Sequence, residues 1–170
     1  MDSKLMIRDE TAADADVIAD VTISAFEAVE ISQQTEHLII SALRDAAALT
    51  LSLVAEIDGV VVGHIAFSPV SISDGTRGWY GLGPVSVKPD CQHQGIGKAL
   101  IREGLTRLRA LDAKGCCLVG HPDYYGQFGF ENTSGLVVEG VPEEVFFALS
   151  FVGAVPQGSV TFHEAFAAQS

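Results

Sequence analysis

Basic residues are scarce in this chain of 170 residues: 10 lysines and arginines stand against 22 aspartates and glutamates, so the formal net charge is -12. Proteins bind phosphate backbones and anionic lipid surfaces largely through Lys and Arg contacts. The charge therefore argues against a nucleic-acid or membrane-surface partner. It would attract a cationic partner such as an amine, although acidity that serves only solubility remains an alternative.

Cysteines, long apolar runs and targeting signals are also few or missing. Cys91, Cys116 and Cys117 form no C-x-x-C pair, and adjacent cysteines would point to opposite faces of a strand. This usage fits a reducing, cytoplasmic location, and we expect no metal because the His and Cys spacings match no ligand pattern. No apolar run approaches the ~18 residues of a membrane helix, and the N-terminus carries no targeting signal that we can read.

The chain does contain enough apolar residues for one substantial core. Hydrophobic residues make up 48% of the sequence and charged residues 19%, and the length is typical of one domain. We find no repeat, low-complexity segment or linker. The sequence therefore predicts a single domain over residues 1–170. The apolar run 145–151 either packs inside that domain or contributes to a homodimer interface.

Apolar periodicity and turn residues predict alternating strands and helices. The Asp58-Gly59 pair favours a tight hairpin, and Pro84 lacks an amide hydrogen, so its strand should separate from one neighbour there. The expected strands are 4–8, 51–57, 60–67, 79–87, 116–119, 130–138, 145–151 and 160–163. Helices are expected after Thr11, from Ser32 with Ser32 or Thr35 as the cap, at 95–111 and, briefly, at 124–127. The first of them should face the core with Ile18, Val21, Ile23, Phe26 and Val29, and the helix 95–111 with Ile96, Leu100, Ile101, Leu105, Leu108 and Leu111.

A glycine-containing loop between a strand and a helix is the most informative segment. It follows Val85, Ser86 and Val87 and runs through Gln92, His93, Gln94, Gly95, Ile96, Gly97, Lys98 and Ala99. Free N–H groups at the positive end of a helix dipole bind phosphate. A dinucleotide loop would need a third glycine at Leu100, and a nucleotide-triphosphate loop would need Ser or Thr at Ala99, so neither pattern fits. A loop that only packs helix against strand remains the alternative.

The spacing Gln92-x-x-Gly95-x-Gly97 after a Val-x-Val strand resembles the pyrophosphate loop of the GNAT acetyltransferases. A second segment, Tyr124-Tyr125-Gly-Gln-Phe128-Gly129-Phe130, is similar to the tyrosine segment of a small bacterial subgroup of that family. The resemblance implies an α/β fold with a mixed, twisted sheet of about six or seven strands, splayed at the central strands and flanked by helices. It implies acetyl-CoA as cosubstrate, bound in a cleft between the Val85 strand and the Cys116 strand.

The resemblance also implies roles for individual residues. Tyr125 would protonate or hydrogen-bond the departing thiolate, since a hydroxyl with a pKa of ~10 lies only modestly above a thiol at ~8.5. The backbone of residues 85–87 would pair with the pantetheine arm and offer an N–H to the thioester oxygen. A structural role for Tyr125, with its hydroxyl bonded to backbone, is the alternative. Many family members carry an Asn before this tyrosine, and Leu118-Val119-Gly120-His121 has none.

The predicted reaction is acetyl transfer to a small amine or a protein amino group by direct attack in a ternary complex, without an acyl-enzyme. Candidates for a general base are His64, His121, Glu27, Glu30 and Ser86, and spacing selects none of them. Two alternatives stay open. One is a coenzyme A-binding sensor or accessory protein without turnover, and the other is an acyltransferase that uses a longer acyl group.

Overall fold

A computed structural model describes residues 4–29 and 32–168. The chain divides into two compact units, each built from separated segments. Unit 1 comprises Met1–Phe67, Gly83–Thr106 and Glu164–Ser170, and unit 2 comprises Ser68–Leu82 and Arg107–His163. Each unit is described by itself below.

Unit 1 contains an antiparallel sheet formed by β1 (Leu5–Asp9), β2 (Leu51–Ile57) and β3 (Val60–Pro69), of which the last two residues fall in unit 2. The β2–β3 hairpin turns at Asp58 and Gly59, whose φ angles are 51° and 83°. Both lie in the left-handed region that this turn requires. The predicted hairpin is thus confirmed. A β-bulge shifts the register between Ala55 and Glu56.

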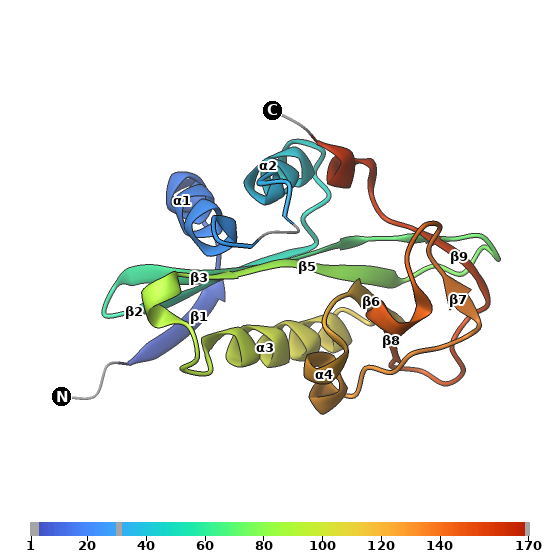
Figure 1. The fold of residues 1–170 in the computed structure, drawn as a ribbon. Coiled ribbons are helices and arrows are strands. Elements are labelled where there is room, and N and C mark those ends of the chain that lie inside the picture. The colour runs from blue at the N-terminus through green and yellow to red at the C-terminus, as the bar shows by residue number, and fades with distance from the viewer. Residues whose placement is uncertain (1–3, 30–31, 169–170) are drawn as a thin grey trace. The chain divides into compact units, whose positions relative to one another are not determined.

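Helices cover both faces of this sheet (Figure 1). On one face α1 (Ala15–Phe26) and α2 (Glu36–Asp45) enclose an apolar cluster, formed by Ile18, Val21, Ile40, Val54 and Val61. On the other face lies α3 (Ile96–Ala110), so close that a Cβ on Gly104 would stand 2.3 Å from the Phe67 ring. The absence of a side chain at Gly104 therefore lets this helix pack directly on β3.

The predicted helices exist, but parts of their core stripes are wrong. Ile23 is 43% exposed and Val29 38% exposed, because Ile23 lies about 200° around α1 from the buried Val21 and Val29 follows the helix end. Leu111 is 54% exposed since α3 ends one residue before it. The second helix, predicted from Ser32 with Ser32 or Thr35 as its cap, begins at Glu36 with Thr35 as the N-cap residue.

Unit 2 is built on the first part of β5 (Trp79–Val87), which runs parallel to β6 (Gly115–Val119), and β6 runs antiparallel to β8 (Phe146–Ser150). The β5–β6 register ends at Gly81, three residues before Pro84, which agrees with a strand that separates from a neighbour there. Short strands complete the unit: β4 (Ser71–Ile72), β7 (Leu136–Val137) and β9 (Gly158–Thr161). The strand predicted over 130–138 is reduced to β7 and an isolated bridge at Glu131, because a turn at Thr133–Gly135 interrupts it.

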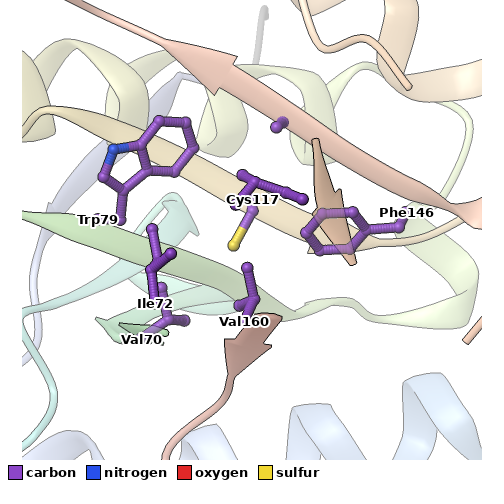
Figure 2. Close-up of a cluster of buried hydrophobic side chains, with 8 residues drawn as sticks. Val70, Ile72, Trp79, Cys117, Phe146 and Val160 are labelled. Carbon is purple, nitrogen blue, oxygen red and sulfur yellow. The ribbon is translucent and has the colours of Figure 1, made fainter. Parts of the chain in front are cut away.

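The core of unit 2 contains Cys117 among apolar side chains (Figure 2), which include Trp79, Phe146 and Val160. Burial raises the pKa of the Cys117 thiol to about 12, so this cysteine is a packing residue. Phe146, Phe147 and Ala148 are all buried. The apolar run near 145–151 is therefore largely interior, as one of the two alternatives predicted.

In strand order the larger sheet reads β1-β2-β3-β5-β6-β8, and the smaller one reads β4-β9-β7. Along the chain, α1 and α2 lie between β1 and β2, and α3 lies between β5 and β6. This confirms the predicted α/β class with a mixed sheet of about six strands flanked by helices. Among the described residues, no helix combines the length and the apolar character needed to cross a membrane.

Candidate functional site

The predicted phosphate loop lies in unit 1, between β5 and α3. Lys88 N–H donates to Val62 O over 2.8 Å, which holds the end of β5 against β3. The Gln92 side-chain amide donates to Val87 O over 3.0 Å, so Gln92 fastens the loop to its own strand. Gly95 then takes a φ of 85°, a left-handed conformation that favours glycine. This turn directs the chain into the first residue of α3.

Four successive N–H groups at this turn have no acceptor within the described part of the protein: those of Gly95, Ile96, Gly97 and Lys98. The first helical bond is made by Ala99 N–H, which donates to Gly95 O over 3.0 Å. Unpaired N–H groups at a helix N-terminus carry a positive partial charge and bind anions. The residues present thus fit a diphosphate.

The side chain of Ser86 is more deeply buried than those of its neighbours on the predicted cofactor strand. It is 1% exposed, and its hydroxyl donates to Thr22 Oγ1 of α1 over 3.4 Å. Val85 and Val87 are half-buried. Ser86 therefore faces α1, which argues against it as a base that reaches a substrate through bound water.

Tyr125 belongs to unit 2, at the end of α4 (Pro122–Tyr125). Its ring contacts those of Tyr124, Phe128, Phe130 and Phe147, with centroids 4.9 to 6.4 Å away. Burial raises the pKa of its hydroxyl to about 12, with a smaller contribution from Tyr124. The hydroxyl makes no hydrogen bond with any described residue. The alternative, a structural tyrosine whose hydroxyl bonds to the backbone, therefore does not describe Tyr125.

Gly120 explains how Tyr125 comes so close to the end of β6. A Cβ at this position would lie 2.3 Å from Cε2 of the Tyr125 ring. The glycine therefore leaves the space that the ring occupies. The next residue, His121, accepts a hydrogen bond from Asp123 N–H at its Nδ1 over 3.2 Å and so caps α4. This local role weakens His121 as a candidate base.

The remaining candidate bases do not form a group. Glu27 is exposed after the last residue of α1, and Glu30 lies outside the described residues. Cys91 is half-buried, and burial raises the pKa of its thiol, which agrees with a packing role. Within the described ranges, no cluster of three or more His, Cys, Asp or Glu side chains could hold a metal ion.

His64 is completely buried and belongs to a polar network of unit 1. Arg44 donates twice to the Glu10 carboxylate, over 2.8 and 2.9 Å. The Ser52 hydroxyl donates to Glu10 Oε1, so its oxygen is left to accept from His64 Nε2, 2.7 Å away. This order of donors fixes the tautomer and leaves His64 Nδ1 as an unprotonated, unpartnered nitrogen. His64 cannot take a proton from a substrate, because its Nε2 already donates and its Nδ1 is enclosed.

The pKa of His64 is lowered to about 4, first by burial and then by Arg44, while Glu10 opposes the shift. His64 is therefore neutral at pH 7 and forms no ion pair with Glu10, whose Oε1 is 4.0 Å away. For Glu10 itself, burial alone would raise the carboxyl pKa, but the bonds from Arg44 and Ser52 outweigh it and leave a net lowering.

A stability measurement against pH tests this assignment. The unfolded histidine takes up a proton near pH 6.5 and the folded one only near 4, so stability is complete above pH 6.5 and falls as the pH decreases toward 4. Between pH 7.5 and pH 4.5 the parent should lose about 2 to 3 kcal/mol of unfolding free energy through this group. Urea unfolding of the parent and His64→Gln at both pH values measures the difference. Equal losses in the two proteins would contradict the assignment.

Sequence reasoning missed a cavity of about 260 Å³ between α1 and α2, whose lining includes Ile23, Phe26, Glu36 and His37. Its walls come from two helices and the segment between them. No local pattern marks such a cavity, because an isolated histidine on an amphipathic helix is ordinary in a sequence.

The mixed sheet flanked by helices agrees with the class of protein that the motifs predicted, an acyltransferase of the GNAT type. The family model described as the acetyltransferase (GNAT) domain matches residues 49–132. The uncharacterized N-acetyltransferase YhbS of Escherichia coli strain K12 is 34% identical over 128 residues, which are 75% of this chain and 74% of that protein. The chain belongs to the GNAT acetyltransferase family.

Two solved structures extend the likeness to nearly the whole chain. A GNAT family acetyltransferase from Brucella melitensis, in complex with acetyl-CoA, is 51% identical with a TM-score of 0.87, over 96% of this chain and 98% of that one. The Escherichia coli YhbS structure, in complex with CoA, is 30% identical with a TM-score of 0.89, over 100% and 96%. These relatives confirm the predicted fold and enzyme class, and they do not favour the sensor without turnover.

Proposed function

We propose that this protein transfers the acetyl group of acetyl-CoA to an amine by direct attack in a ternary complex. The observation that carries the proposal is the set of four unpaired N–H groups between Gly95 and Lys98, placed at the start of α3. The Brucella melitensis relative, half identical in sequence, was solved in complex with acetyl-CoA. In this chain the four amides would bind the diphosphate group of acetyl-CoA.

The predicted site residues take different parts in this proposal. Backbone amides within 92–99 would bind the pyrophosphate, whereas the Gln92 side chain holds the loop to Val87. The backbone of Val85–Val87 would pair with the pantetheine arm and donate an N–H to the thioester oxygen. His93 and Lys98 are exposed at the loop and would add donors or positive charge for the phosphates.

The proposed chemistry balances with one proton released and one proton supplied. The acceptor ammonium first loses a proton, and the neutral nitrogen attacks the thioester carbonyl carbon. The C–S bond of the resulting tetrahedral species breaks, and the thiolate of coenzyme A takes the proton of the Tyr125 hydroxyl. The nitrogen loses its second proton as the amide forms, and one proton taken up by the phenolate restores Tyr125, so that one proton is released overall. With a pKa near 12, this hydroxyl is protonated throughout the neutral range and is available as a donor.

Other parts of the assignment follow from the same proposal. We propose that residues 1–170 work as one GNAT domain of the subgroup that carries the Tyr-Tyr-x-x-Phe-Gly-Phe signature. The described cysteines are all free, which supports a cytoplasmic location. The acceptor would be a small-molecule amine or a protein amino group, and a homodimer remains a prediction.

Release of free coenzyme A thiol from acetyl-CoA in the presence of an amine panel tests the function. The panel would hold small aliphatic, aromatic and polyamine acceptors together with lysine-containing and N-terminal peptides. Amine-dependent thiol release, with an acetylated product identified by mass spectrometry, is the expected result. Tight acetyl-CoA binding without any amine-dependent release would instead support the sensor. A higher rate with longer acyl-CoAs would revise the acyl group.

A further inference from the structure

The residue that directly follows β6 is a glycine for a steric and not for a conformational reason. Gly95 and Gly129 have φ angles of 85° and 97°, which favour glycine, whereas the φ angle of Gly120 lies outside the left-handed region. The Gly120 N–H donates to Val145 O over 2.9 Å, which fixes its backbone. A residue with a side chain could therefore adopt this φ angle, and only the space for that side chain is missing.

The Tyr125 ring occupies the space beside Gly120. A Cβ at position 120 would lie 2.9 Å from Cδ2 of that ring and closer still to Cε2. Because non-bonded carbon atoms pack at about 3.5 to 4.0 Å, the ring would have to move by roughly 1 Å. The same Cβ would lie 3.1 Å from Cδ1 of the buried Leu118. The methyl group of an alanine would therefore be confined as well, and the ring would have to yield.

Aromatic packing holds the Tyr125 ring on its other sides. Phe130 and Phe147 are 2% and 4% exposed, and each ring centroid lies 6.2 Å from that of Tyr125. The Tyr124 ring meets it edge-on at 4.9 Å. Tyr125 is half-buried, and its hydroxyl makes no hydrogen bond with any described residue. Contacts of the ring, and not a bond to the hydroxyl, therefore determine where the hydroxyl lies.

We propose that Gly120 is a positioning residue for acetyl transfer, because the absence of a side chain there sets the place of the Tyr125 hydroxyl. The inference rests on the proposed function, in which the coenzyme A thiolate takes its proton from that hydroxyl. A misplacement of about 1 Å in a reacting group costs about 100-fold in rate. A side chain at position 120 therefore slows the chemical step and leaves acetyl-CoA binding by the loop amides of residues 95–98 unchanged.

The first experiment compares two glycines on either side of the tyrosine segment. With an amine that the parent acetylates, Gly120→Ala should lower kcat about 30- to 100-fold, while the KM for acetyl-CoA stays within about threefold. Gly126→Ala is the matched control: Gly126 follows Tyr125 directly, has a φ of -59°, and a Cβ there would meet no atom within 4 Å. Its kcat should stay within about twofold of the parent. Equal kcat values in the two alanine variants would overturn the inference.

Combination with Tyr125→Phe separates positioning of the hydroxyl from a general lesion of the fold. Phenylalanine keeps the ring edge, and thus the same clash with a methyl group at position 120, but it has no hydroxyl to displace. In the Tyr125→Phe background, Gly120→Ala should therefore change kcat by less than about twofold. A further loss as large as the one in the parent would mean that Gly120 acts through another part of the protein.

NMR spectra of protein with ¹³C-labelled tyrosine rings report the position of Tyr125 without catalysis. The ring lies among those of Tyr124, Phe128, Phe130 and Phe147, whose ring currents make its signals sensitive to displacement. These signals, assigned through Tyr125→Phe, should move in Gly120→Ala and stay in place in Gly126→Ala. Unmoved signals in Gly120→Ala would overturn the inference whatever the activity. An unchanged rate in Tyr125→Phe would instead remove this tyrosine from the proposed function.

A further variant covers the case in which Gly120→Ala does not fold. Leucine lacks the outer ring carbons that meet the methyl group at position 120. Gly120→Ala/Tyr125→Leu should therefore fold, with a thermal unfolding midpoint close to that of Tyr125→Leu alone. If Tyr125→Leu folded and the double variant did not, the glycine would be required by a contact other than the Tyr125 ring, and the inference would be wrong.

Discussion

Gly97→Glu is expected to abolish measurable acetyl-CoA binding, with an affinity at least 100-fold below that of the parent. Gly97 is the second residue of α3 and half-exposed. Its N–H is one of the four unpaired donors proposed to hold the pyrophosphate. A glutamate there places a negative charge beside two phosphates, and such a pair at 4 Å repels by about 4 kcal/mol near a protein surface. The side chain also occupies the space of the ligand.

The same substitution is favourable for the helix itself, which separates binding from folding. Glutamate exceeds glycine in helix propensity by up to about 1 kcal/mol, and an acidic residue in the first turn is stabilised by the helix dipole. The thermal unfolding midpoint of the free variant should therefore equal or exceed that of the parent. Isothermal titration with acetyl-CoA measures the affinity, and added salt should reduce the difference because part of it is electrostatic.

Thr106→Glu supplies the matched control for Gly97→Glu. Thr106 is exposed on the same helix, and its hydroxyl donates to Arg102 O over 3.0 Å. The change adds the same charge nine residues after Gly97 and beyond the first turn, so acetyl-CoA affinity should stay within threefold of the parent. Lys98→Glu tests the loop again through an exposed side chain. If both loop variants bound acetyl-CoA as tightly as the parent, the loop would have no role in holding the cosubstrate.

The loop could be predicted from the sequence because all of its determinants are local. The strand end at Val87, the glycine at 95 and the apolar stripe of α3 lie within about twenty residues of one another. The Asp58-Gly59 turn is local in the same sense. Each of these features depends on backbone conformation and side-chain periodicity, which a single sequence displays. They were sufficient to indicate an anion-binding helix start and the family.

The surroundings of His64 could not be predicted, because they depend on a one-residue shift between strands. A tight turn at Asp58-Gly59 continued without interruption would pair His64 with Leu53. The β-bulge between Ala55 and Glu56 pairs it with Val54 instead. A shift of one residue moves a side chain to the opposite face of the sheet. His64 therefore faces α1 and α2 and lies within hydrogen-bonding distance of Ser52. No residue type in the hairpin predicts the bulge.

Tyr125→Phe is expected to lower kcat for acetyl transfer about 100-fold while the KM for acetyl-CoA stays within threefold. The phenylalanine ring preserves the contacts with Phe130 and Phe147, whose centroids lie 6.2 Å away. It removes only the hydroxyl, which makes no hydrogen bond with any described residue. Loss of a proton donor to a leaving group typically costs 10²- to 10⁴-fold, and the unpaired hydroxyl leaves no internal bond whose loss would destabilise the fold.

Tyr124→Phe is the neighbouring control, since its ring meets that of Tyr125 edge-on at 4.9 Å. Its kcat should remain within threefold of the parent. The pH dependence distinguishes the two tyrosines further. Because the pKa of Tyr125 is raised to about 12, the parent rate should show no fall from tyrosine ionisation up to about pH 10.5. A Tyr125→Phe enzyme that kept its rate would mean that the coenzyme A thiolate leaves without help from this residue and that the ring only packs. A hundredfold loss that is absent in Tyr124→Phe would instead assign the leaving-group proton to the Tyr125 hydroxyl.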